Sequence, residues 1–189
     1  MSLHFNEIFL RPLVDSDINK RYISWFADPE VTRFLEVRNI AIEDSKRYLK
    51  NGIVTGMYYI FAICISESNL HIGNIKIGPI KRKDGVSDLV TVLGDRNYWG
   101  KGIASIAIKK AVELGFSQGR IRKFTASIDS LNIGSIKAYL KGGFKKEAVI
   151  PNYFYNYINN IETISDKVFV GLENDHYDMD ILKNWVPSN

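Results

Sequence analysis

The stretch of residues 90–105 constrains the chain more than any other. It begins with residues typical of a β-strand (90–94), continues through a turn (95–99), and reaches Gly100 and Gly102 where an amphipathic helix is expected to begin. The first N–H groups of a helix have no acceptor within the helix and lie at the positive end of its dipole, so they favour phosphate groups. Glycines let such a ligand approach the bare backbone. This order predicts a site for a cofactor that carries a pyrophosphate.

Spacing separates the known kinds of glycine-rich phosphate loop. A P-loop is excluded because Gly94 lies one residue too far from Gly100-Lys101, and Gly102 stands where Ser or Thr is required. A dinucleotide fingerprint is disfavoured because Ser105 replaces its third glycine. Residues 119–125 also lack the carboxylate that would bind the ribose.

A third interpretation rests on two motifs that occur in order. The first motif is Tyr98-Trp99-Gly100-Lys101-Gly102-Ile103-Ala104. The second has the spacing N-x-x-S-x-x-x-Y-x-x-x-G-F and consists of Asn132, Ser135, Tyr139, Gly143 and Phe144. Together they resemble the acetyl-coenzyme A site of the GNAT N-acetyltransferases, and most of all the branch that contains the ribosomal-protein N-terminal acetyltransferases. The resemblance in pattern extends from about residue 7 to residue 144, and its specific motifs lie in the second half.

Length and composition are those of one globular domain, residues 1–189, with 46% hydrophobic and 24% charged residues. The sequence has no apolar run long enough to span a bilayer and no basic-then-apolar leader. We therefore expect a cytoplasmic protein with no membrane partner. Cys64 is the only cysteine and lies in an apolar run, so we expect a small buried hydrophobic residue.

Charge and histidine spacing bear on the possible ligands. The net charge of +4 is mild, and the basic residues are not interleaved with aromatic residues that would stack on bases, so no nucleic-acid partner is expected. A cofactor with several phosphates is another use for this charge. His4, His71 and His176 lie far apart without metal-ligand spacing, so no metal is expected.

Periodicity and turn residues predict the order of the elements. Helices are expected from a cap at residues 15–17 to Phe26, over 42–51 with an end at Gly52 and Gly56, from 103 to the glycines at 115 and 119, and after Asn132. Strands are expected at 8–13, 58–65, 71–77, 88–94, 122–128, from 144, at 152–157, at 167–172 and at 176–182. The class is α/β (α+β), and the resemblance implies a GNAT fold: a mixed sheet of about seven strands with a splayed parallel pair, and about four helices.

The resemblance also implies roles for individual residues. The backbone amides of Gly100, Lys101, Gly102, Ile103, Ala104 and Ser105 would hold the pyrophosphate of acetyl-CoA. Backbone groups of Val92, Leu93 and Gly94 would pair with the pantetheine amides. Asn132 would contact the coenzyme and also cap its helix. Tyr139 would be the general acid that protonates the departing thiolate, although its helical spacing also suits a core residue. Trp99 would either contact the cofactor or pack beneath the turn.

The general base and the acceptor stay open at this point. Related enzymes of the best-described subgroup carry a glutamate five residues before the motif asparagine, where this chain has Ser127. The candidates are a relay through ordered water and the carboxylates of Asp88, Asp95, Asp129 and Glu36.

The sequence is compatible with three functions. Residues 73–80 look like members that acetylate amino sugars, which favours a small-molecule amine such as a nucleotide-linked amino sugar. A protein amino terminus is the enzymatic alternative. A CoA-binding module without catalysis is the alternative of another class. A monomer and a homodimer both fit the sequence.

Overall fold

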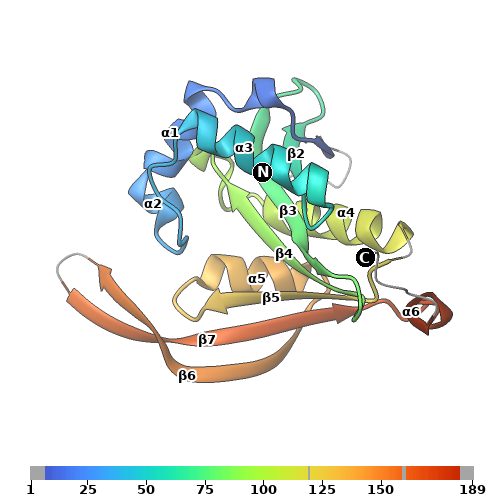
Figure 1. Cartoon of the computed structure of the whole chain (residues 1–189). Helices are drawn as coiled ribbons and strands as arrows, with labels where there is room; N and C mark the ends of the chain where they lie inside the picture. Colours follow the sequence, from blue (N-terminus) through green and yellow to red (C-terminus); the bar gives the residue numbers. More distant parts are fainter. Residues whose placement is uncertain (1–6, 119, 159–160, 184–189) are drawn as a thin grey trace.

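The computed structural model describes residues 7–118, 120–158 and 161–183, and its centre is one mixed sheet of seven strands (Figure 1). The strand order is β1-β2-β3-β4-β5-β7-β6, and all neighbours are antiparallel except β4 and β5. The strands are β1 (Ile8–Pro12), β2 (Tyr59–Ile65), β3 (His71–Lys81), β4 (Val86–Leu93), β5 (Lys123–Asp129), β6 (Lys145–Ile158) and β7 (Ile161–Glu173). The mixed sheet and its single parallel pair confirm the predicted fold class.

Six α-helices and two short 3-10 helices accompany the sheet in the described part of the chain. The α-helices are α1 (Lys20–Ala27), α2 (Pro29–Thr32), α3 (Ile42–Thr55), α4 (Ile103–Ser117), α5 (Ile133–Lys141) and α6 (Asp180–Lys183). The 3-10 helices are η2 (Asp15–Asp17) and η3 (Arg96–Tyr98). The sequence predicted about four helices, and the additional ones, α2 and α6, have four residues each. No helix among these described segments has the length and hydropathy of a membrane span.

The sheet has a hydrophobic core on each face. On one face, Ile103, Ala107 and Ile108 of α4 pack against strand residues such as Ile63. On the other face, the side chains of α1 and α3 cover Ala62 and Cys64. Because β2 contributes to both cores, its sequence is apolar without alternation, as predicted for a strand covered on both sides. Cys64 is fully buried, as expected.

Two helices continue through glycines that the sequence suggested as endpoints. Helix α3 passes Gly52 and ends before Gly56, which adopts φ +60°. A Cβ on Gly52 would lie 2.4 Å from the ring of Tyr58. Helix α4 passes Gly115, where a Cβ would lie 2.3 Å from the ring of Phe124. Both glycines therefore serve close packing and do not end their helices; the other predicted endpoint, residue 119, lies outside the described residues.

The start of α1 also differs from the prediction. Asp15 and Asp17 belong to η2, and the cap of α1 is Asn19, whose side chain accepts hydrogen bonds from the N–H groups of Arg21 and Tyr22. The reason is that Asp17 is already engaged: its carboxylate pairs with Arg11 at 2.6 Å and accepts the N–H of Val14.

The C-terminal part contains one wrong strand prediction. Residues 176–182, interpreted as a closing strand, form a turn followed by α6. The turn is closed by Tyr177 N–H donating to the carbonyl of Asn174, and Asp178 accepts the N–H of Asp180 as a cap. The strands expected from residue 144 and at 152–157 are one long strand, β6, with an irregularity between Ile150 and Phe154.

The close approach at Gly115 gives a test of this packing. Gly115→Ala should lower the free energy of unfolding by about 1–3 kcal/mol, because the new methyl group must displace the Phe124 ring from a filled core. Gly134→Ala in α5 is the control: its Cβ would meet only the side-chain oxygen of Asn132 at 4.0 Å, so stability should stay unchanged or rise. Urea denaturation measures both. Equal stability of the two variants would contradict the packing at Gly115.

Candidate active site

The parallel strands β4 and β5 stay together only at their beginnings. They pair from Val86 to Asp88 with Lys123 to Thr125, and the Thr125 hydroxyl donates to the Asp88 carboxylate at 2.6 Å beside the last pair. Beyond this point β5 pairs with β7 and β4 pairs with β3, so the two strands separate (Figure 1). Among the described residues, one edge of β4 beyond Asp88 therefore has no strand beside it, and we call the gap beside this unpaired edge the opening.

The register of β4 decides which backbone groups face this opening. In an antiparallel pair, backbone groups of successive residues point alternately toward and away from the neighbouring strand. Gly94 N–H donates to the carbonyl of Ile72 at 3.0 Å, so Gly94 and, two residues earlier, Val92 are directed toward β3. The backbone groups of Leu89, Thr91 and Leu93 therefore face the opening. Of the three residues predicted to pair with pantetheine, only Leu93 has this orientation.

Tyr139 of α5 reaches this open edge from the core. Its hydroxyl donates to the Leu89 carbonyl at 2.5 Å and lies 3.5 Å from the Thr91 hydroxyl, while its ring packs edge-on against Phe144. The residue is 3% exposed, and this burial raises the pKa of the phenol above its ordinary value. At neutral pH Tyr139 is therefore a protonated hydrogen-bond donor at the point where the strands separate.

The start of α4 is not capped by a side chain. Gly102, the N-cap residue, has φ +81°, and Gly100 has φ +73°. The Ser105 hydroxyl turns back to donate to the Gly102 carbonyl at 2.7 Å. The amides that follow Gly102 thus lack a side-chain acceptor within the described residues, and a Cβ on Gly100 would meet nothing within 4 Å. This is the geometry of an anion site at a helix N-terminus.

Aromatic and basic side chains border this helix start. The Trp99 indole N–H donates to the Leu93 carbonyl at 2.9 Å, although 39% of the residue remains exposed. The Arg96 guanidinium lies 5.7 Å from the centre of the Trp99 ring, and the Lys101 ammonium lies 5.2 Å from that of Tyr98. Trp99 therefore binds the last carbonyl of β4, and Arg96 and Lys101 place positive charge on the turn that leads into α4.

Asn132 caps α5, as the sequence predicted. Its side-chain oxygen accepts the N–H of Ser135 at 3.1 Å, and its own N–H donates to the Asp129 carbonyl. The cap uses only the oxygen of the side-chain amide. Because the amide nitrogen is a separate donor, a coenzyme contact is compatible with the cap.

The predicted general-base candidates have different surroundings. Asp88 accepts the Thr125 hydroxyl, Asp95 accepts Asn97 N–H and pairs with Arg21, and Asp129 accepts Leu131 N–H. Glu36 is exposed between α2 and α3, and Ser127 is exposed on β5. Among the described residues, no group of three or more His, Cys, Asp and Glu side chains is arranged to hold a metal ion.

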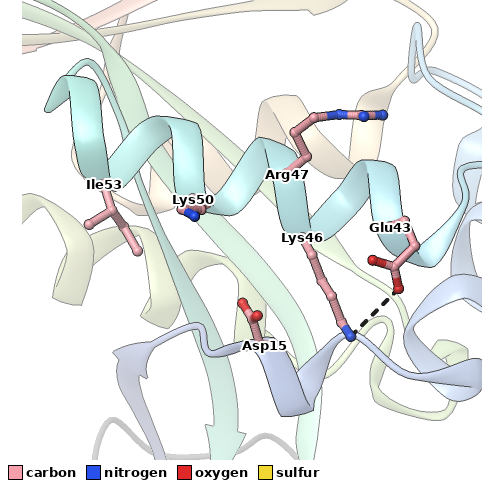
Figure 2. Close-up of a pocket in the computed structure, with 6 residues that line it drawn as sticks. All are labelled: Asp15, Glu43, Lys46, Arg47, Lys50 and Ile53. Carbon is pink, nitrogen blue, oxygen red and sulfur yellow. Dashed lines mark ion pairs between the residues drawn. The ribbon is translucent and has the colours of Figure 1, made fainter.

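A groove of about 540 Å³ lies elsewhere on the molecule, between η2 and α3 (Figure 2). Its lining residues are Asp15, Glu43, Lys46, Arg47, Lys50 and Ile53. The Lys46 ammonium lies 3.8 Å from the Glu43 carboxylate, and Arg47 pairs with Asp44. Because two of the three lining cations are paired with carboxylates on the same helix and none of the lining residues is a predicted site residue, we interpret the groove as solvated surface.

Leu89 and Thr91, whose backbone groups face the opening, are not among the residues predicted from the sequence. The available signal was the alternation of a strand: once Gly94 is assigned to the β3 side, the odd-numbered residues before it face away. The sequence also did not predict the contact between Trp25 and Gly94. The Trp25 ring lies 2.0 Å from the position of a Cβ on Gly94, so only glycine fits between this indole and the end of β4.

The family model of the acetyltransferase (GNAT) domain matches residues 7–145. This chain belongs to the GNAT family. It is therefore an acetyl-CoA-dependent N-acetyltransferase. The GNAT enzyme is 28% identical over 145 residues to the uncharacterized N-acetyltransferase p20 of Bacillus licheniformis, with 75% of this chain and 79% of p20 covered.

Solved structures show the same fold at low sequence identity. The spermidine N-acetyltransferase of Vibrio cholerae, in complex with CoA and spermine, is 14% identical, with TM-score 0.77 over 89% of this chain and 96% of that one. The ribosomal-protein-S5-alanine acetyltransferase of Vibrio fischeri is 20% identical, with TM-score 0.73 over 94% and 99%. The splayed strands and helix order described above are thus those of GNAT enzymes.

Asn132 offers a test that separates capping from coenzyme binding. Asn132→Ser keeps a capping oxygen but removes the amide donor, so unfolding should change little while the Kd for CoA rises about tenfold. Asn132→Ala should in addition lower stability by about 1 kcal/mol. Calorimetric titration and thermal unfolding measure the two effects. Wild-type CoA affinity in Asn132→Ser would exclude the coenzyme contact.

Proposed function

We propose that this GNAT enzyme transfers the acetyl group directly from acetyl-CoA to the primary amine of a small molecule, within a ternary complex and with Tyr139 as general acid. The observation that carries the proposal is the position of the Tyr139 phenol, which is buried, protonated and bonded to the Leu89 carbonyl on the open edge of β4. Nothing in this arrangement requires a covalent acetyl-enzyme.

The helix start fits the diphosphate of the cofactor. The amides of Ile103, Ala104 and Ser105 follow an N-cap glycine without a side-chain acceptor, and the space beside Gly100 is open. We assign the diphosphate to these amides, with Lys101 contributing positive charge nearby.

The open edge of β4 fits the pantetheine arm, whose amides would pair with it as a missing strand would. We assign this pairing to Thr91 and Leu93, because Val92 and Gly94 are directed toward β3. Trp99 already binds the Leu93 carbonyl, so it fixes the end of the edge and leaves the Leu93 N–H as the group for the ligand.

Acetyl-CoA supplies the acetyl group in activated form, as a thioester. When the acceptor amine forms its bond to the acetyl carbon and the carbon–sulfur bond breaks, the sulfur leaves with an electron pair and accepts the Tyr139 proton. Burial keeps this proton on the phenol until that moment, because the raised pKa disfavours the phenolate in the resting enzyme. The phenolate then recovers a proton from solvent.

The acceptor amine must lose a proton before or during attack. Asp88, Asp95 and Asp129 are each engaged in hydrogen bonds that fix strands or turns. We therefore propose deprotonation through water, with the exposed Glu36 as the remaining carboxylate candidate. Water can serve as this proton acceptor when a fraction of the amine is already neutral near physiological pH.

Two solved structures and one sequence resemblance bear on the acceptor class. The V. cholerae neighbour is a spermidine acetyltransferase, and residues 73–80 resemble amino-sugar acetyltransferases, so both a polyamine and a nucleotide-linked amino sugar are small amines to be tested. The V. fischeri neighbour, an S5-alanine acetyltransferase, supports a protein amino terminus as the second candidate. A panel of dTDP-amino sugars, polyamines and short peptides, assayed for free thiol release, separates these acceptors. Release with none of them, despite CoA binding, would favour a module without catalysis.

Tyr139→Phe tests the acid role. The variant keeps the ring contact with Phe144 but lacks the proton, so kcat should fall about 100-fold while the Kd for CoA stays within about threefold. Tyr48→Phe, which removes an exposed phenol of α3, should leave the rate unchanged. Steady-state kinetics and calorimetry measure both quantities. An unchanged rate in Tyr139→Phe, with CoA still bound, would show that another group protonates the sulfur.

A further inference from the structure

A large cavity lies at the end of α4 opposite to the proposed diphosphate site. Its volume is about 1030 Å³, it is partly open to solvent, and it is lined by the last turn of α4, apolar residues of β2 and β3, and α6. Figure 1 shows α6 beside this end of the sheet, where β4 and β5 begin. Since α4 has 15 residues, its two ends are roughly 22 Å apart, so the cavity is separate from the acetyl-transfer site.

The cavity wall is mainly apolar and carries positive charge. Side chains such as Phe61, Ile80 and Leu114 form the apolar part, and Arg82 and Arg120 are also in the wall. Arg82 is fixed in place by donating to the Gly56 carbonyl at 3.1 Å, which engages one of its five N–H groups. No carboxylate side chain is among the described residues that line the cavity.

Tyr177 adds a polar group with no partner. Its ring is part of the cavity wall, and its hydroxyl is buried without a hydrogen-bond partner among the described residues. The residue is positioned by the turn in which its N–H donates to the Asn174 carbonyl. Because this hydroxyl is covered by protein atoms, Tyr177 contributes ring surface to the wall and no hydrogen bond to a ligand in the cavity.

We propose that this cavity binds a carboxylic acid with an apolar chain or ring system. Its carboxylate pairs with the guanidinium groups of Arg82 and Arg120. Its apolar part lies against the side chains of β2, β3 and the end of α4. Carboxylates match the planar guanidinium group, and the size and lining of the cavity are typical of small-molecule sites. The inference does not depend on acetyl transfer.

Decanoate, decylamine and decanol are suitable probes for titration of the full-length protein by calorimetry. Decanoate should bind at least about tenfold more tightly than decylamine or decanol, because only its head group complements two arginines. The double variant Arg82→Gln/Arg120→Gln should lose this preference, whereas Tyr177→Phe, which keeps both arginines and the ring in the wall, should retain it. Tyr139→Phe is the control at the acetyl-transfer site and should bind decanoate as the wild type does. Circular dichroism verifies that each variant is folded.

Three results would overturn the proposal. The first is displacement of decanoate by CoA, which would place the probe in the acetyl-transfer site. The second is equal binding of the three probes, which would show that the arginines do not select an anion. The third is unchanged decanoate binding in Arg82→Gln/Arg120→Gln, which would place the probe away from these arginines. Simultaneous binding of decanoate and CoA, with the expected selectivity, would support it.

Discussion

The separation of β4 from β5 after Asp88 is the constraint on which the rest of the site depends. Backbone groups inside a sheet must find hydrogen-bond partners, and a strand that loses a neighbour presents a row of groups without them. Two side chains satisfy part of the unpaired edge of β4: the Tyr139 hydroxyl donates to the Leu89 carbonyl, and the Trp99 indole N–H donates to the Leu93 carbonyl. The groups of Thr91 between them remain for a ligand that resembles a strand.

Helix α4 joins this open edge to the rest of the molecule. Its N-terminus begins at a left-handed glycine without a side-chain cap, beside the end of β4, and its apolar side fills the core of one face of the sheet. The same packing positions α5, because the end of that helix approaches so closely that a Cβ on Gly142 would lie 2.5 Å from Ile108. The rigid core thus fixes both the helix start and Tyr139, while the other end of α4 borders the arginine-containing cavity.

The sequence predicted those parts of the site that depend on local patterns. The glycines before Ile103, the cap at Asn132 and the presence of Tyr139 on its helix follow from spacing alone. The orientation of β4 could not be predicted in this way, because it is set by the register of its pairing with β3. A register shift of one residue would exchange the backbone groups that face the opening. Contacts between distant parts of the chain could not be predicted from local patterns. Gly52 and Gly115 lie within helices where the rings of Tyr58 and Phe124 approach the backbone closely. Asp17 does not cap α1 because its carboxylate pairs with Arg11.

Hydrogen exchange of individual backbone amides, followed by NMR with and without CoA, locates the amides that CoA protects. We expect CoA binding to slow exchange at two places at once. The first is Thr91 and Leu93 on the open edge of β4, and the second is Ile103 to Ser105 at the start of α4. The amides of Val92 and Gly94, which face β3, should change little. Protection of Val92 and Gly94 in place of Thr91 and Leu93, or no change at the helix start, would contradict this expectation.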